Sequence, residues 1–206
     1  MSTSRTLALV LLVSLQALVH CSCNDGKNNI VQVADASKNN IIQVTDGVGQ
    51  SYYSNWQPSC YKNSANLQLP GILSLVSGTI NVGKKMKVIG NSKALLTLKK
   101  DSIFVGTVCE DGKSTNFLVP DSDCTIDLCS VEGGLCSTLE IPGIHKLGEL
   151  EGDVNTNGTI LLPKISSALK PLIKGKWQLQ VKLQVGNEIA LHVKVPSNQD
   201  WLWLDE

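Results

Sequence analysis

Apolar residues recur at every second position over much of the chain, which is the spacing of β-strands with one buried face. In the clearest run, from Trp177 to Val185, apolar side chains alternate with Gln or Lys. Gly186-Asn187 then supplies a tight turn, and the alternation resumes from Ile189 to Val195. The pattern predicts an antiparallel hairpin with one buried and one solvated face.

Shorter apolar runs precede this hairpin, at 67–69, 80–88, 96–98 and 103–108. Short strands separated by turn residues predict an all-β fold, either a sandwich or a barrel. One segment departs from the spacing of two, because Ile165, Ala168, Leu169 and Leu172 have helical spacing. A short helix, interrupted by Pro171, is expected there.

The first residues have the pattern of a secretory signal, with Arg5 followed by the apolar run 7–19. This run is too short to span a bilayer as a helix. Cleavage after Cys21 and cleavage after Cys23 satisfy the small-residue rule about equally well. We expect a signal peptide at 1–23 and a secreted or lysosomal product; a retained signal anchor is the alternative.

A doubled segment follows the signal, KNNIVQVAD at 27–35 and KNNIIQVTD at 38–46. Two copies are too few for a solenoid. The valines and isoleucines favour strands, but the Asn pairs and the Gly-containing stretch 47–54 favour low order. The sequence therefore predicts a poorly ordered extension at 24–54 and one folded domain at 55–206.

Charge and cysteine content narrow the function classes. Lys and Arg total 18, as do Asp and Glu, and the lysines are spread among strand patterns, so nucleic-acid binding is not expected. Of seven cysteines, the four between Cys109 and Cys136 indicate local disulfides, because their spacing is wider than that of zinc sites. Cys60 can pair with Cys23, provided that signal cleavage retains Cys23.

No catalytic arrangement is recognisable, so we expect neither an enzyme nor a cofactor. His145 and His192 lie outside any nucleophile–base motif, and the acids at 149, 151 and 153 are typical of a solvated edge. Residues 153–160 copy the first eight positions of an EF-hand loop, but Lys164 replaces the last ligand, so a polar turn is favoured over a metal site. Asn157 begins a glycosylation sequon.

The chain ends in Trp-Leu-Trp-Leu at 201–204. A terminal strand or patch that docks on the core is the favoured interpretation. The alternative is an interfacial anchor, a role in which Trp is common.

Several short motifs, taken in order, resemble the ML family of lipid-recognition domains, and within it the ganglioside-activator branch. They are Asn55-Trp56 leading to Cys60, Pro70-Gly71, SGTINV at 77–82, VGTVC at 105–109, DCTIDLC at 123–129, and LPKISSALKPLIKGKWQLQV at 162–181. Each motif alone is weak, whereas their order and spacing together are more specific.

The resemblance implies an immunoglobulin-like antiparallel β-sandwich that holds lipid between its sheets. It also implies one disulfide between Cys109 and Cys124 and, because the family's usual partners are missing, another between Cys129 and Cys136. The implied cavity residues are Ile80, Val82, Phe104, Trp177, Leu179, Val181, Leu183, Leu191 and Val193. The implied rim residues are Leu139, Ile141, Ile144, Leu147, Leu169 and Leu172.

Three functions follow as hypotheses. The first is a carrier that takes a glycolipid, phospholipid or sterol from a membrane surface and presents it to a partner such as a lysosomal glycosidase. The second is a secreted signalling or defence protein that uses the same scaffold. The third and weakest is a hydrolase that uses His145 or Glu149.

Overall fold

The computed structural model describes residues 23–131, 133–149, 158–167 and 169–206. Strands dominate these residues, which confirms the expected β class. The helical elements are short: α1 (Leu128–Val131), α2 (Gly133–Leu139), α4 (Lys170–Ile173) and the 3-10 turns η1 (Asp121–Cys124) and η2 (Leu147–Glu149). Within the described ranges, no helix is long and apolar enough to cross a membrane.

The strands form one curled, mixed sheet with two halves. The first half has β5 at its centre, with β2 on one side and β10 and β11 on the other, all antiparallel to β5. Its strands are β1 (Ile30–Asp35), β2 (Ile42–Tyr53), β5 (Gly71–Val82), β10 (Gly143–Lys146) and β11 (Thr159–Leu162).

The second half is built around β12, which pairs with β13, β6 and β14. The short strands β7, β8 and β9 extend it beyond β6, and β14 pairs in parallel with β4. Its strands are β3 (Cys60–Tyr61), β4 (Ser64–Gln68), β6 (Ser92–Lys100), β7 (Thr107–Glu110), β8 (Lys113–Ser114), β9 (Thr125–Ile126), β12 (Gly175–Val185), β13 (Glu188–Val195) and β14 (Leu202–Asp205).

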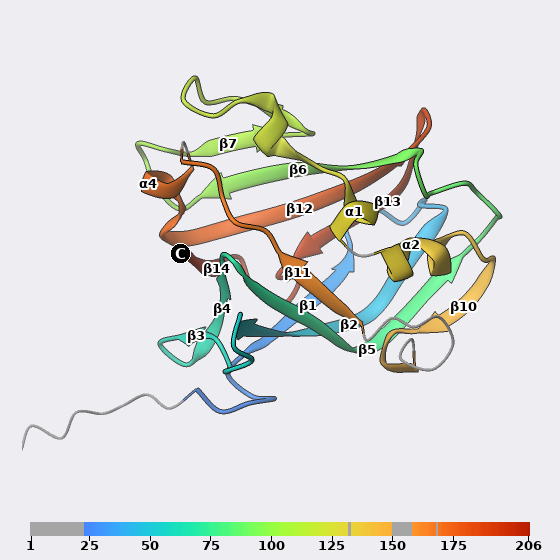
Figure 1. Cartoon of the computed structure of the whole chain (residues 1–206), viewed down its shortest axis with the longest axis horizontal. Helices are drawn as coiled ribbons and strands as arrows, with labels where there is room; N and C mark the ends of the chain where they lie inside the picture. The colour runs from blue at the N-terminus through green and yellow to red at the C-terminus, as the bar shows by residue number, and fades with distance from the viewer. Residues whose placement is uncertain (1–22, 132, 150–157, 168) are drawn as a thin grey trace, which may run out of the picture.

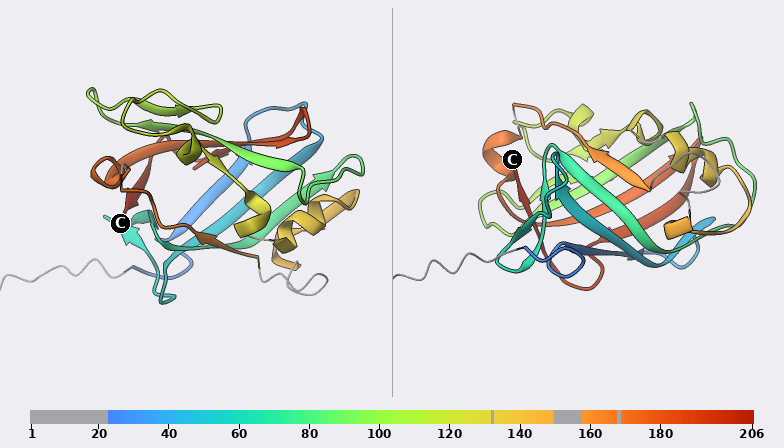
Figure 2. Two further views of the ribbon diagram at one scale, coloured as in Figure 1. Left: turned by 45° about the horizontal axis from the view of Figure 1, so that its top comes forward. Right: turned by 60° about the horizontal axis from the view of Figure 1, so that its bottom comes forward.

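Strand β1 joins the two halves. Its first residues pair with β2, whereas Ala34 and Asp35 pair with Lys194 and Val193 of β13. The sheet is therefore continuous and curls until its halves face each other, as the two views of Figure 2 show. Helix α4 and the C-terminus lie at one end of the molecule, and α2 and β10 lie at the other (Figure 1).

The expectation of a poorly ordered extension at 24–54 is corrected by the structure. Residues 30–35 and 42–53 are the first two strands, and Val31 and Ile42, equivalent positions of the repeat, are 1% and 0% exposed. Both repeat copies place apolar side chains in the core, Val31 from the first and Ile42 and Val44 from the second, so burial outweighs the turn preference of the Asn pairs. The folded domain thus begins well before Asn55.

The predicted C-terminal hairpin is confirmed. β12 and β13 pair from Leu179↔Val195 to Val185↔Glu188, and Gly186 takes a positive φ of 58° in the turn. A register shift after Leu183 marks a bulge near that turn. The tail is also a strand, because Leu202 and Leu204 are buried in β14, which agrees with the docking interpretation.

Three disulfides link six of the seven cysteines. Cys109–Cys124 and Cys129–Cys136 match the pairs that the family resemblance implied, and Cys23–Cys60 answers the question that the sequence left open. The last of these ties the N-terminal segment to β3. The helical spacing around Leu169 is likewise realised as α4, with Pro171 in its first turn.

Candidate functional site

Two apolar clusters fill the space between the halves of the sheet. The α4 cluster lies at the end where α4 packs and includes Trp177, Leu98, Leu73, Leu169 and Ile173. The α2 cluster lies at the other end and joins side chains of both halves, Ile42, Ile80 and Val82 with Leu183 and Val193, to Leu139 of α2. The halves therefore pack against each other at both ends of the molecule.

Most of the predicted cavity residues face inward. Ile80, Val82, Trp177, Leu183 and Val193 are buried within the two clusters. Leu179, Val181 and Leu191 also pack against a cluster but are only half-buried.

Phe104 departs from the prediction, because its side chain is 98% exposed. The apolar run 103–108 suggested a strand, but β7 begins only at Thr107. Gly106 takes a positive φ of 60° and its N–H donates to Ser102 O, so the chain turns sharply there. Phe104 is therefore carried on a loop outside the core.

Half-buried apolar side chains pack against both clusters, and we call five of them the middle row. It consists of Val33, Leu75, Ile160, Leu179 and Val181. Val33 and Val181 pack against both clusters, which places them at the boundary. At Leu179 and Val181, β12 is paired with a strand on each side, so these residues do not lie at a sheet edge. Their accessible surface therefore lies on the inner face of the sheet.

Strand β2 contributes glycines where it faces the middle row. A Cβ on Gly49 would lie 2.8 Å from Leu73 Cδ1, and one on Gly47 would lie 3.0 Å from Val44 Cγ1. The register shifts of the β2–β5 pairing fall in the same stretch. Both glycines are therefore closely packed, Gly49 by Leu73 and Gly47 by Val33 and Val44, and a Cβ at either position would force its neighbours to shift.

The predicted rim residues do not form one rim. Leu139 and Leu147 are buried in the α2 cluster, whereas Leu169 is buried in the α4 cluster and Leu172 packs against it. Ile141 and Ile144 are exposed near α2 and β10. The structure thus divides these residues between opposite ends of the molecule (Figure 1).

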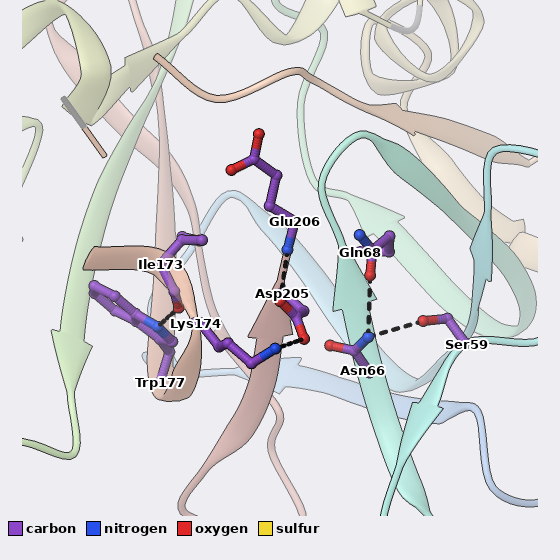
Figure 3. Close-up of polar contacts among 8 residues, drawn as sticks. All are labelled: Ser59, Asn66, Gln68, Ile173, Lys174, Trp177, Asp205 and Glu206. Carbon is purple, nitrogen blue, oxygen red and sulfur yellow. Dashed lines mark hydrogen bonds and ion pairs between the residues drawn. The ribbon is translucent and has the colours of Figure 1, made fainter. Parts of the chain in front are cut away.

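Helix α4 is held in place by charged groups of the chain end. Lys174 Nζ lies 3.0 Å from Asp205 Oδ2, and Lys170 forms an ion pair with Glu206. The indole N–H of Trp177 donates to Ile173 O at 2.5 Å (Figure 3). Lys100 donates to Leu172 O, and its burial lowers the pKa of its ammonium group. The C-terminal strand and β12 thereby fix α4 over its cluster.

Four large apolar side chains project from two loops at the α4 end. Ile103, Phe104, Phe117 and Leu118 are 100%, 98%, 94% and 53% exposed, and we call them the tip residues. The two loops are neighbours, because the Thr115 N–H donates to Val108 O and its hydroxyl to Thr107 O. Sequence analysis missed this surface because the apolar run at 103–108 resembled a strand.

Two hollows are outlined by described residues. One of about 320 Å³ is lined by Gly90, Asn91, Ser92, Lys93, Gln184 and Gly186 near the β12–β13 turn. The other, of about 130 Å³, is lined by Gln32, Val33, Ala34, Asp46, Gly47, Val48 and Ser197. The predicted cavity residues line neither of them, and only Val33 belongs to the middle row.

The two histidines occupy separate positions. His192 contacts Gln180 Oε1 at 2.9 Å, and its burial lowers its pKa. His145 lies in β10 and its Nε2 contacts Ile141 O at 2.8 Å. Asn157, Glu151 and most of the EF-hand-like stretch 153–160 lie outside the described residues.

No family model matches the chain, and no curated protein is similar to it at a significant level.

Proposed function

We propose that this chain is a secreted or lysosomal lipid-binding protein that holds an acyl chain or a comparable apolar ligand between the halves of its sheet. The scaffold we propose is an immunoglobulin-like sandwich of the ML type, without enzymatic activity. The observation that carries this proposal is the middle row. These side chains pack against the clusters but keep part of their apolar surface accessible, and an apolar ligand would cover that surface.

The energetics favour an apolar guest in this place. Water against the middle row gains few hydrogen bonds from the side chains around it, because Val, Leu and Ile carry no polar atoms. Each methylene that moves from water to this surface contributes about 0.8 kcal/mol. A bound lipid would therefore complete the apolar core. Without lipid, the two packed clusters would keep the halves of the sheet at their separation.

A transfer assay tests the proposal. Purified protein is mixed with donor vesicles that carry a quenched fluorescent phospholipid or glycolipid, and with unlabelled acceptor vesicles. The proposal predicts that dequenching becomes faster in proportion to protein concentration. The blank is buffer without protein. If transfer of phospholipid, glycolipid and sterol probes is no faster than in the blank, the result would count against a lipid carrier and favour a secreted signalling or defence protein.

The tip residues supply a surface for transient membrane contact, which a lipid carrier needs for loading. Large apolar side chains at this degree of exposure are unfavourable in water, and two aromatic rings on adjacent loops suit the membrane interface. We propose that the tip residues contact the membrane from which the lipid is taken. Once a lipid is loaded, a partner such as a glycosidase would receive it.

Replacement of Phe104 and Phe117 by Asp is expected to weaken vesicle association by at least about tenfold, because burial of each ring contributes about 1.5–3 kcal/mol. Stability should change by less than about 0.5 kcal/mol, since both rings are exposed. Vesicle co-flotation measures the association. The control is Ile144→Asp, which alters a 74% exposed side chain at the other end. Equal losses in both variants would argue against the tip residues as the contact.

A further inference from the structure

We infer that signal peptidase cuts this chain between Cys21 and Ser22, so that the secreted protein begins at Ser22 with three disulfides. The inference rests on the proposed secretion and adds the processing site to it. Signal peptidase prefers small residues directly before the cleaved bond and two residues earlier. The bond after Cys21, with Val19 two residues before it, and the bond after Cys23 both satisfy this rule. The fold distinguishes between them.

The first argument is the disulfide network. Cys23 pairs with Cys60, and the two Cα atoms are 5.8 Å apart, a normal separation for a disulfide. The other four cysteines of the domain pair with each other. Cleavage after Cys23 would leave a single thiol on Cys60, whereas cleavage after Cys21 removes one cysteine and leaves six that are all paired.

A second observation supports the Cys23–Cys60 bond itself and does not involve sulfur. The residues directly after Cys23 belong to the folded domain, because Asn29 is 0% exposed and its amide donates to Asp25 Oδ1 at 3.0 Å and to Ser51 O at 3.2 Å. The hydroxyl of Tyr52 donates to the same carboxylate at 2.9 Å. The segment after Cys23 is thus anchored to β2 in the product of either cleavage, and only cleavage after Cys21 keeps its covalent attachment to β3 through Cys23.

The experiment uses the full chain, secreted from eukaryotic cells and treated with glycosidase. We expect N-terminal sequencing to start at Ser22, and the intact mass to equal residues 22–206 less two hydrogens for each of three disulfides. Peptide mapping without reductant should recover Cys23 linked to Cys60. A secreted chain that begins at Asn24, or any other N-terminus, would overturn the assignment of the bond.

Two matched variants complete the test. Cys21→Ser keeps a small residue before the bond, so we expect the same N-terminus, no reaction with maleimide and unchanged secretion. Cys23→Ser should expose one thiol per chain, on Cys60, to maleimide. A thiol that reacts in the unaltered secreted protein would overturn the inference. Full-length chain found only inside the cells would overturn the signal peptide. Failure of the lipid-transfer assay would change neither the expected N-terminus nor the expected disulfides.

Discussion

Replacement of Val181 by Trp is expected to abolish lipid uptake while the protein stays folded. Val181 lies at the boundary of the two clusters, on the inner face of a strand that is paired on both sides. An indole there would occupy the volume proposed for the ligand. Val181 is only half-buried, so the larger side chain can extend into the accessible space beside it. Uptake of a fluorescent fatty acid and a urea unfolding curve measure the two effects.

The matched control is Gln178→Trp, an equally bulky change on the outer face of the same strand. It should leave lipid uptake at the level of the unaltered protein. If the middle row were in fact packed solid, Val181→Trp would cost about 1–3 kcal/mol or more through overpacking. Normal uptake by Val181→Trp, or a severe loss of stability without ligand, would contradict the proposed location.

Deletion of residues 27–46 is expected to prevent folding. The deletion removes β1 and the start of β2, and with them Val31, Ile42 and Val44 from the core. It also removes the pairing of β1 with β2 and β13, which joins the two halves of the sheet. Circular dichroism and gel filtration of the refolded protein should show an unfolded or aggregated chain.

A milder pair of variants tests the same point quantitatively. Ile42→Ala should lower the free energy of unfolding by about 2–5 kcal/mol, the usual cost of truncating a buried Ile. Gln32→Ala, on the exposed side of β1, should change it by less than about 0.5 kcal/mol. A deleted chain that unfolds at the same temperature as the intact one would show that the hairpin is an appendage. A partner-binding role for the repeat is therefore better tested at exposed side chains than by deletion.

The sequence predicts those elements whose local pattern and tertiary role agree. β12 alternates from Trp177 to Leu183 and β13 from Leu191 to Val195, because one face of each stays on the core there. Near the turn the bulge after Leu183 changes the pattern, so that Ile189 is 42% exposed and Ala190 is buried. The pairing of Cys129 with Cys136 was implied by the resemblance to the ML family, whose usual partners for these two cysteines are missing from this chain. The helix around Leu169 is found where apolar spacing changes from two to three or four.

Other features depend on contacts that no local pattern contains. In β2 and β5 the bulges exchange the inner and outer faces midway, and the glycines of β2 face inward, so the alternation is broken. The N-terminal repeat therefore resembled a linker. Phe104 was misplaced for the opposite reason, since an apolar run was taken as a strand although Gly106 turns the chain. The division of the rim residues between two ends follows from the curl of the sheet, which spacing along the chain does not specify.

Native mass spectrometry of the protein secreted by eukaryotic cells tests the central claim most directly. We predict a population heavier than the polypeptide and its glycan by the mass of one lipid, which organic extraction removes and incubation with vesicles restores. Val181→Trp should lack this population, and Gln178→Trp should retain it. A single species at the mass of the bare glycoprotein, unchanged after incubation with phospholipid, glycolipid and sterol vesicles, would contradict the proposal that an apolar guest binds between the halves of the sheet.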